Sequence, residues 1–218
     1  MGTVSADSIR DELARLILTG ERAAALTSAL SAIADGSTDI PALYSWLSEV
    51  LRDVGESWRD GRAAVWQEHR ATAIVRTIVE SMAPDVLRSA APQNGQTVVL
   101  ACPEDESHEL GLRMLADRFL LVGWGVVYLG ADTPAGEVAA AARSTDANLI
   151  VLSASTHFHR MRLRTVLETL AAEVPDTRVL VGGPALCGDG MATVDGHVFD
   201  PNEFFEDAAG LAPSCEEV

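Results

Sequence analysis

The chain has little of what several protein classes require. Its three cysteines, Cys102, Cys187 and Cys215, are odd in number and widely spaced. They predict neither a disulfide framework nor a zinc knuckle and indicate a reducing compartment. Basic residues are scarce, because 16 Lys and Arg stand against 32 Asp and Glu, a formal net charge of −16. This balance argues against direct binding to nucleic acid or to an anionic membrane, since both need clustered basic residues.

Long apolar runs are also missing. No stretch of about 18 apolar residues occurs, so the sequence predicts no membrane span. Residues 1–7 lack the basic and apolar regions of a secretory signal, and Ala6 breaks the myristoylation pattern. We therefore expect a cytoplasmic protein. The apolar fraction of 48% is ordinary for a globular chain, so a packed core is expected in both halves.

The first half of the chain has helical periodicity, with apolar residues at three- and four-residue spacing. They are Ile9, Leu13, Leu16 and Ile17; Leu26, Leu30 and Ile33; Leu43, Leu47, Val50, Val54 and Trp58; and, within 68–82, Ile74, Ile78 and Met82. Gly20, Gly36 and Gly61 stand between these segments, and Pro41 suits a first helical turn. Four amphipathic helices with short loops predict a four-helix bundle over residues 5–90.

After a linker at 90–96 the pattern changes. Short apolar runs occur at 97–101, 125–129, 149–152 and 179–181, with a weaker one at 197–199, and helical segments alternate with them at 109–122, 135–143 and 160–173. Unbroken apolar runs indicate strands that are buried on both faces. We therefore expect a Rossmann-like, doubly wound parallel sheet over 95–212, followed by a flexible acidic tail at 213–218.

Ligands of such sheets bind at the carboxyl ends of the strands, where three loops of this chain stand out. The first contains Glu106, His108 and Gly111. A carboxylate two residues before a histidine can hold the ring in one tautomer, as the partner of a metal-bound histidine does. The glycine permits a close approach to the helix start. A loop histidine beside a capping glutamate would explain the same residues without any ligand.

The other two loops carry small residues. Ser153 and Ser155 follow the third predicted strand, and Gly182 and Gly183 follow the fourth. Taken alone, the serines suit a helix cap and the glycines an ordinary turn. Together, the three loops resemble the signature of the cobalamin-binding domain, which is an acidic residue-x-His-x-x-Gly, then Ser-x-Leu, then Gly-Gly. The gaps of 41 residues between the first two motifs and of 26 between the last two match the family's spacing.

This resemblance implies how cobalamin is held. The dimethylbenzimidazole base leaves cobalt, its tail enters a slot beside the sheet, and His108 replaces it as the lower axial ligand. Glu106 would accept a hydrogen bond from His108. The residues expected to line the path of the tail are Ser153, Ser155, Gly182 and Gly183. Ser155 stands where the family usually has Leu. We therefore expect the wall of the tail pocket to carry a serine in place of a leucine.

A further motif lies in the helical half, where Trp58 is followed after nine residues by Glu68-His69. Its order and spacing resemble those of the CarH-type photoreceptors, whose chromophore is adenosylcobalamin. In that family the Trp packs on the adenosyl group and the Glu-His pair contacts it, so the bundle covers the upper corrin face. Glu106, rather than Asp, favours the same group. Without a ligand, these residues would be a core aromatic and a charged helix start.

Two features depart from the CarH pattern. CarH proteins carry an N-terminal DNA-binding domain, for which we expect no room here. Signalling is therefore expected through a light-dependent homo-oligomer or a protein partner. CarH proteins also have a His directly after the motif Trp, where this chain has Arg59. The alternatives for the upper ligand after photolysis are His69, His157, His159 or water.

The chain is also similar to the photocobilins, stand-alone sensors that hold biliverdin near cobalamin. Biliverdin would then be a second, non-covalent chromophore, since no cysteine has a clear attachment context. The candidate partners for its propionates are Arg59, Arg62, His157, His159, Arg160 and Arg162.

Three functions stay open at this point, and we expect none of them to be an enzyme, because no nucleophile–base pair stands out. The first is a light sensor in which photolysis of adenosylcobalamin shifts the bundle. The second is a corrinoid methyl carrier of a methyltransferase system, which needs an open upper face and is disfavoured by Trp58, Glu68 and His69. The third is a cobalamin-dependent antirepressor.

Overall fold

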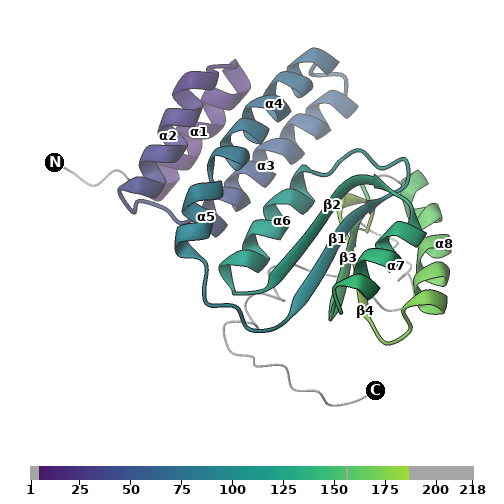
Figure 1. Ribbon diagram of the computed structural model, residues 1–218. Helices are drawn as coiled ribbons and strands as arrows, with labels where there is room; N and C mark the ends of the chain where they lie inside the picture. The colour runs from purple at the N-terminus through teal and green to yellow at the C-terminus, as the bar shows by residue number, and fades with distance from the viewer. Residues whose placement is uncertain (1–4, 156, 187–218) are drawn as a thin grey trace. The chain divides into compact units, whose positions relative to one another are not determined.

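The computed structural model describes residues 5–155 and 157–186, which fall into two compact units divided between Ser89 and Ala90 (Figure 1). Each unit is described by itself. The weaker strand expected at 197–199, two of the cysteines and the acidic tail lie outside the described residues.

The first unit is helical. Its elements are α1 (Ala6–Thr19), α2 (Arg22–Ala34), α3 (Ile40–Arg59), α4 (Val65–Ser81) and a short α5 (Ala83–Ser89). Side chains cap two of the helices, because Ser5 accepts a hydrogen bond at the start of α1 and Asp39 does so at the start of α3. Gly20 ends α1 in the left-handed conformation. The four predicted helices are confirmed, and α4 begins three residues earlier than expected.

The helical core is built as predicted in α1, α3 and α4 but not in α2. The expected side chains of α2, Leu26, Leu30 and Ile33, are only partly buried. Its buried residues are Ala25, Ala29 and Ala32. Alanine has the smallest side chain that suits a helix, so this face lets α2 lie close against α1 and α4. Trp58, grouped by its spacing with the apolar face of the third helix, is not part of this core, because its side chain is half exposed at the end of α3.

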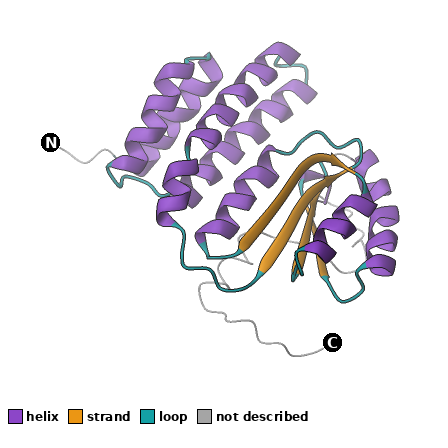
Figure 2. Cartoon of the chain, viewed as in Figure 1, coloured by secondary structure: helices purple, strands orange, loops and turns teal. Residues whose placement is uncertain are grey.

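The second unit contains one parallel sheet (Figure 2). Its strands are β1 (Thr97–Pro103), β2 (Gly125–Thr133), β3 (Leu149–Ser153) and β4 (Arg178–Gly182), in the order β2-β1-β3-β4. Helices α6 (Leu110–Leu121), α7 (Ala135–Ser144) and α8 (His157–Glu173) follow the first three strands, and a short 3-10 turn, Pro184–Leu186, follows β4. The predicted Rossmann-like fold is confirmed.

Helices cover both faces of the sheet, with α6 on one face and α7 and α8 on the other (Figure 1). Alternate residues of β1 consequently enter two different clusters. Val98 and Leu100 pack in the cluster that contains Phe119 of α6, whereas Val99 and Ala101 pack with residues of α7 and α8. Burial on both faces explains why the strand sequences are unbroken apolar runs.

The strand order fixes where a ligand site can form. From the central β1 the chain passes to β2 on one side and later to β3 on the other, and ligands of such sheets bind where the order reverses. The loops after β1 and β3 flank this point. At the same edge β2 carries a bulge, because Leu100 pairs with Tyr128 and Ala101 with Gly130.

Gly183, directly after β4, supports a first prediction. Its φ is +103°, and an added Cβ would lie 2.4 Å from the carbonyl oxygen of Ala154. This clash involves backbone that no rotamer change can relieve. We expect Gly183→Ala to lower the free energy of unfolding by about 2–4 kcal/mol, measured by urea denaturation followed by circular dichroism.

Gly136→Ala is the matched control, because an added Cβ at Gly136, in the first turn of α7, meets nothing within 4 Å. We expect this variant to be neutral or slightly stabilising. Equal stability of the two variants would contradict the argument.

Candidate functional site

Residues from two loops meet at the carboxyl edge of the sheet. Glu106 and His108 lie in the loop between β1 and α6, and Ser155 follows β3. The side chain of Glu106 is fully buried. Its Oε1 accepts hydrogen bonds from the backbone N–H of His108 at 2.9 Å and from Nδ1 of the same ring at 2.7 Å. Its Oε2 accepts from the backbone N–H of Ser155 at 2.7 Å and from the Ser155 hydroxyl at 2.6 Å.

These contacts decide the charge of Glu106. Burial by itself raises the pKa of this carboxyl, because it disfavours the charged form. The hydrogen bonds from His108 and Ser155 outweigh burial and lower the pKa to about 2. Glu106 is therefore a carboxylate at neutral pH, and both of its oxygens act only as acceptors.

The charge of Glu106 fixes the tautomer of His108. Nδ1 faces two oxygens, Glu106 Oε1 and the Ser155 Oγ at 2.9 Å. The single hydroxyl hydrogen of Ser155 is donated to Glu106, so Ser155 can only accept from the ring. Nδ1 must then carry the proton, and the lone pair lies on Nε2, the atom that a metal would take. The side chain of His108 is 65% exposed, so the ring is accessible to a large ligand.

The loop that carries these residues is braced from its other side by β2. The backbone N–H of Asp105 donates to the Asp132 carboxylate at 2.8 Å, and the N–H of Asp132 donates to the Glu106 carbonyl at 3.0 Å. Asp105 and Asp132 both have positive φ, at 67° and 54°. Sequence reasoning missed this pair, for which the only signal is that Asp tolerates the left-handed conformation.

Cys102 lies beneath the same loop. Its side chain is buried, and the thiol donates a weak hydrogen bond to the carbonyl oxygen of His108 at 3.7 Å. Burial, followed by the charges of Glu106 and Glu109, raises the pKa of this thiol to about 12. Cys102 is therefore a neutral thiol at physiological pH.

The start of α6 has a polar support of its own. Tyr128 of β2 donates a hydrogen bond from its hydroxyl to Glu109 at 2.8 Å. Burial and this carboxylate raise the pKa of Tyr128. The guanidinium of Arg113 lies 5.9 Å from the centre of the Tyr128 ring and pairs with the buried Asp117. These contacts hold the first turn of the helix that follows the His108 loop.

The remaining predicted residues of the sheet unit are placed as follows. Gly111 is the second residue of α6, and an added Cβ there would meet nothing within 4 Å. Ser153 is partly buried and pairs with the buried Gly182 across β3 and β4. Gly183 lets the backbone at Ala154 approach closely. The hydroxyl of Ser155 contacts Glu106 and His108.

In the helical unit, the predicted motif lies at the turn between α3 and α4. Trp58 is near the end of α3, and Glu68 and His69 lie at the beginning of α4. The Trp58 side chain is 50% exposed. The Glu68 carboxylate contacts His69 Nδ1 and accepts a hydrogen bond from the Thr72 hydroxyl at 2.7 Å. An exposed aromatic ring and the Glu68–His69 pair therefore share one end of the bundle.

The helix expected at 160–173 would leave His157 and His159 in the preceding loop. In the structure, α8 already begins at His157, so both residues are helical. Their side chains, like those of Arg160 and Arg162, lie outside the described residues.

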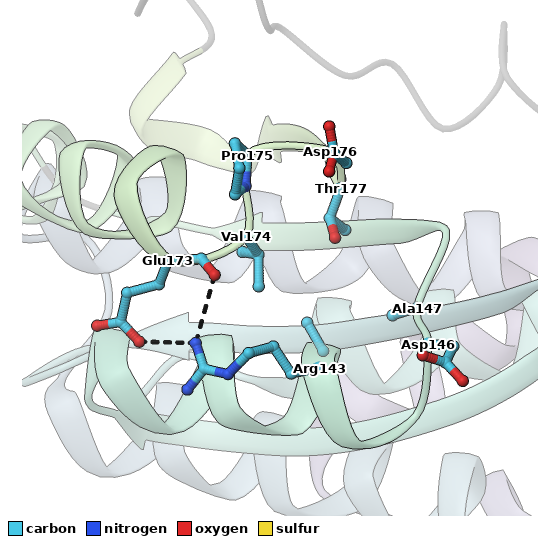
Figure 3. A pocket seen from close by; sticks show the side chains of 9 residues that line it. Arg143, Asp146, Ala147, Glu173, Val174, Pro175, Asp176 and Thr177 are labelled. Atoms are coloured by element: carbon cyan, nitrogen blue, oxygen red, sulfur yellow. Dashed lines mark hydrogen bonds and ion pairs between the residues drawn. The ribbon is translucent and has the colours of Figure 1, made fainter.

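A shallow hollow lies at the opposite edge of the sheet (Figure 3). Ala147 and Thr177, which line it, precede β3 and β4 and so mark the amino ends of the strands. Arg143 reaches Glu173 across it, with 2.8 Å between the guanidinium and the carboxylate. The hollow is thus separate from the site around Glu106.

Comparisons with known proteins agree with this geometry. Two family models, each described as a B12 binding domain, match residues 9–81 and 96–203. The chain therefore belongs to the cobalamin-binding family, with a helical unit and a Rossmann-like unit.

Three relatives are similar in sequence. The HTH-type transcriptional repressors CarA and CarH of Myxococcus xanthus are 33% and 32% identical to this chain over 138 and 140 residues, 63% and 64% of its length. The chain spans less than half of these repressors, 45% and 46% of their lengths. A corrinoid protein of Desulfitobacterium hafniense (strain Y51) is 22% identical over 180 residues, 81% of this chain and 83% of that protein.

The fold is also found in a solved structure. The Methanosarcina barkeri monomethylamine corrinoid protein superposes with a TM-score of 0.72 at 16% sequence identity. The match covers 87% of this chain and 92% of that chain.

The residues of the site fit a corrin. Among the described residues, no group of three or more His, Cys, Asp and Glu side chains could hold a bare metal ion. A corrin brings its own in-plane nitrogens and needs a single ligand from the protein below the ring. An accessible imidazole whose Nδ1–H is held by a buried carboxylate suits that position.

Within the described ranges, no helix is long and apolar enough to cross a membrane.

The pKa of Glu106 leads to a second prediction, for the protein without ligand. The ordinary value is 4.5, so ionised Glu106 contributes about 3 kcal/mol of stability above pH 4.5, which is lost as the pH falls toward 2. In Glu106→Gln an amide NH₂ replaces one carboxylate oxygen. It faces the hydrogen-bond donors of His108 or Ser155, from which it cannot accept. We expect the variant to be less stable than the wild type by about 2–4 kcal/mol at pH 7, in urea denaturation, and the difference to shrink as the pH falls from 4.5 to 2.

Glu173→Gln is the control for this experiment. Glu173 is an exposed carboxylate paired with Arg143, and its removal is expected to cost less than about 1 kcal/mol at pH 7. A Glu106→Gln deficit that stays constant from pH 7 to pH 2 would argue against the ionised carboxylate.

Proposed function

We propose that the chain is a light sensor, not an enzyme, that binds adenosylcobalamin with its dimethylbenzimidazole base displaced and His108 as the lower axial ligand. The observation that carries the cobalamin part is the His108 ring, whose Nδ1–H is bound to the buried Glu106 carboxylate. The light-sensing part is supported by Trp58, half exposed at the same end of the bundle as Glu68 and His69.

In this proposal His108 holds cobalt through Nε2, and Glu106 keeps the ring in the required tautomer. Ser153, Gly182 and Gly183 lie beside the path of the nucleotide tail. Space for the ligand at the start of α6 is supported by Gly111, where an added Cβ would meet nothing within 4 Å.

Adenosylcobalamin supplies a cobalt–carbon bond that visible light breaks. Trp58 would pack on the adenosyl group, and Glu68 and His69 would hold its polar atoms. Trp58 would lose this packing partner on illumination, which changes the state that the bundle favours. We propose that the change alters association with a second copy or with a protein partner. The acidic charge of −16 disfavours nucleic acid as that partner.

Biliverdin as a second chromophore is an extension of this proposal. Arg59 and Arg62 lie beside Trp58 in sequence and offer cations for its propionates. Arg62 already pairs with Asp60 at 2.9 Å, so Arg59 is the better candidate of the two. Adding biliverdin to the cobalamin-loaded protein and recording the red absorption band tests this extension.

A corrinoid methyl carrier is the alternative. Its support is the Desulfitobacterium hafniense corrinoid protein, which this chain matches over 83% of that protein's length. We favour the sensor because identity to the CarA and CarH repressors is higher, 33% and 32% against 22%. Methyl transfer from loaded protein to a methyltransferase, with no response to light, would establish the carrier. A light response seen only with a transcription factor present would indicate an antirepressor.

A third prediction concerns His108. Removing the lower ligand in His108→Ala should weaken cobalamin binding by at least about 10- to 100-fold, the loss that removing a ligand's hydrogen-bond partner already causes, measured by titration in the dark. The absorption spectrum of the loaded variant should also differ from that of the wild type, because imidazole no longer contacts cobalt. Identical spectra and affinities would rule out His108 as the ligand.

A fourth prediction concerns the upper face. Trp58→Ala should lower the preference for adenosylcobalamin over methylcobalamin about tenfold, because the adenosyl group loses its aromatic contact. It should also abolish the light-dependent change in elution volume in size-exclusion chromatography.

Trp66→Ala is the matched control. Trp66, in α4, is another exposed tryptophan. The guanidinium of Arg70 lies over its ring. Removing Trp66 should leave the cofactor preference unchanged. An unchanged preference for adenosylcobalamin over methylcobalamin in Trp58→Ala would contradict the sensor proposal.

A further inference from the structure

Ser155 occupies a position that the surrounding backbone holds firmly. The N–H of Ala154, just before it, donates to the Gly182 carbonyl at 3.0 Å, and the Ala154 carbonyl accepts from the N–H of Ala185 at 3.1 Å. The backbone N–H of Ser155 itself donates to Glu106 at 2.7 Å. The end of β3 is thereby tied to β4 on one side and to the His108 loop on the other.

The hydroxyl of Ser155 lies between the carboxylate and the imidazole. It donates its hydrogen to Glu106 Oε2 at 2.6 Å and, with that hydrogen used, faces His108 Nδ1 as an acceptor at 2.9 Å. Nδ1–H therefore has two acceptors, from two different loops. Two acceptors restrain the plane of the ring as well as its tautomer, which a single carboxylate contact does less well.

We propose that Ser155 is a positioning residue that orients the His108 ring and holds its Nδ1–H tautomer together with Glu106. The leucine usual at this position cannot accept a hydrogen bond, so the second restraint is specific to chains with a hydroxyl here. The inference deepens the proposed function, since it concerns the ring that would ligate cobalt. Its core claim, the tautomer, applies equally to the protein without cofactor.

The first test uses the apoprotein and needs no corrinoid. Long-range ¹⁵N–¹H correlation spectra at pH 8 distinguish the two neutral tautomers, and the His108 signals are assigned by their loss in His108→Ala. The wild type should show the Nδ1–H form. Ser155→Ala should move the equilibrium about fivefold toward the Nε2–H form, the effect of one hydrogen bond, and Ser155→Thr should restore it. An unchanged tautomer in Ser155→Ala would overturn the proposal.

The second test separates positioning from a role in the wall of the tail slot. Cobinamide is a corrinoid without the nucleotide tail, so its affinity reports on the lower ligand and not on the slot. Ser155→Ala should weaken binding of cobinamide and of cobalamin by about the same factor, near fivefold. In a His108→Ala background it should cause no further loss, because positioning acts only through that ring.

The outcomes are distinguishable. A loss confined to cobalamin that persists without the His108 ring would show that Ser155 lines the tail slot and would overturn the proposal. If the wild type binds neither corrinoid, the proposed function fails, while the tautomer measurement still decides the role of Ser155. Ser144→Ala is the matched control, because among the described residues its hydroxyl hydrogen-bonds to the carbonyl of Ala141 at the end of α7, far from the His108 loop in sequence, and it should behave as wild type throughout. Glu106 accepts four hydrogen bonds from His108 and Ser155. Ser155→Ala removes only the one from the hydroxyl, so the carboxylate keeps the other three.

Discussion

One buried carboxylate joins the parts of the site. Burial alone raises the pKa of Glu106, yet the hydrogen bonds from His108 and Ser155 outweigh it and keep the carboxylate ionised. Because the donors come from the loops after β1 and β3, the same charge holds two loops together and orients an imidazole. Every role proposed for His108 depends on it.

The parallel topology makes this contact feasible. In the order β2-β1-β3-β4 the loops after β1 and β3 are neighbours, although their residues are far apart in sequence. The bracing pair Asp105 and Asp132 adds the end of β2 to the same arrangement. Three strand ends therefore fix the loop of His108, and a rigid loop lets a single protein ligand be held in a defined orientation.

Much of the fold could be predicted from the sequence, because each strand carries apolar residues on both faces and each helix has an apolar face. The buried face of α2 could not, since alanines and leucines both fit a helical period and only packing decides between them. Glu106, His108 and the glycines of the site were recognisable by spacing. The contacts of Ser155 and the pairing of Asp105 with Asp132 were not, because they depend on where two loops meet in space.

The thiol beneath the loop has a consequence for ligand competition. A deprotonated thiolate is a soft, strong donor that could compete with imidazole for cobalt. Cys102 is buried in apolar surroundings and lies near two carboxylates, which keeps its sulfur protonated and therefore a poor ligand. Burial is the larger cause and the charges of Glu106 and Glu109 the smaller one. If His108 ligates cobalt as proposed, the loop that orients its imidazole also keeps the neighbouring sulfur out of competition for the metal.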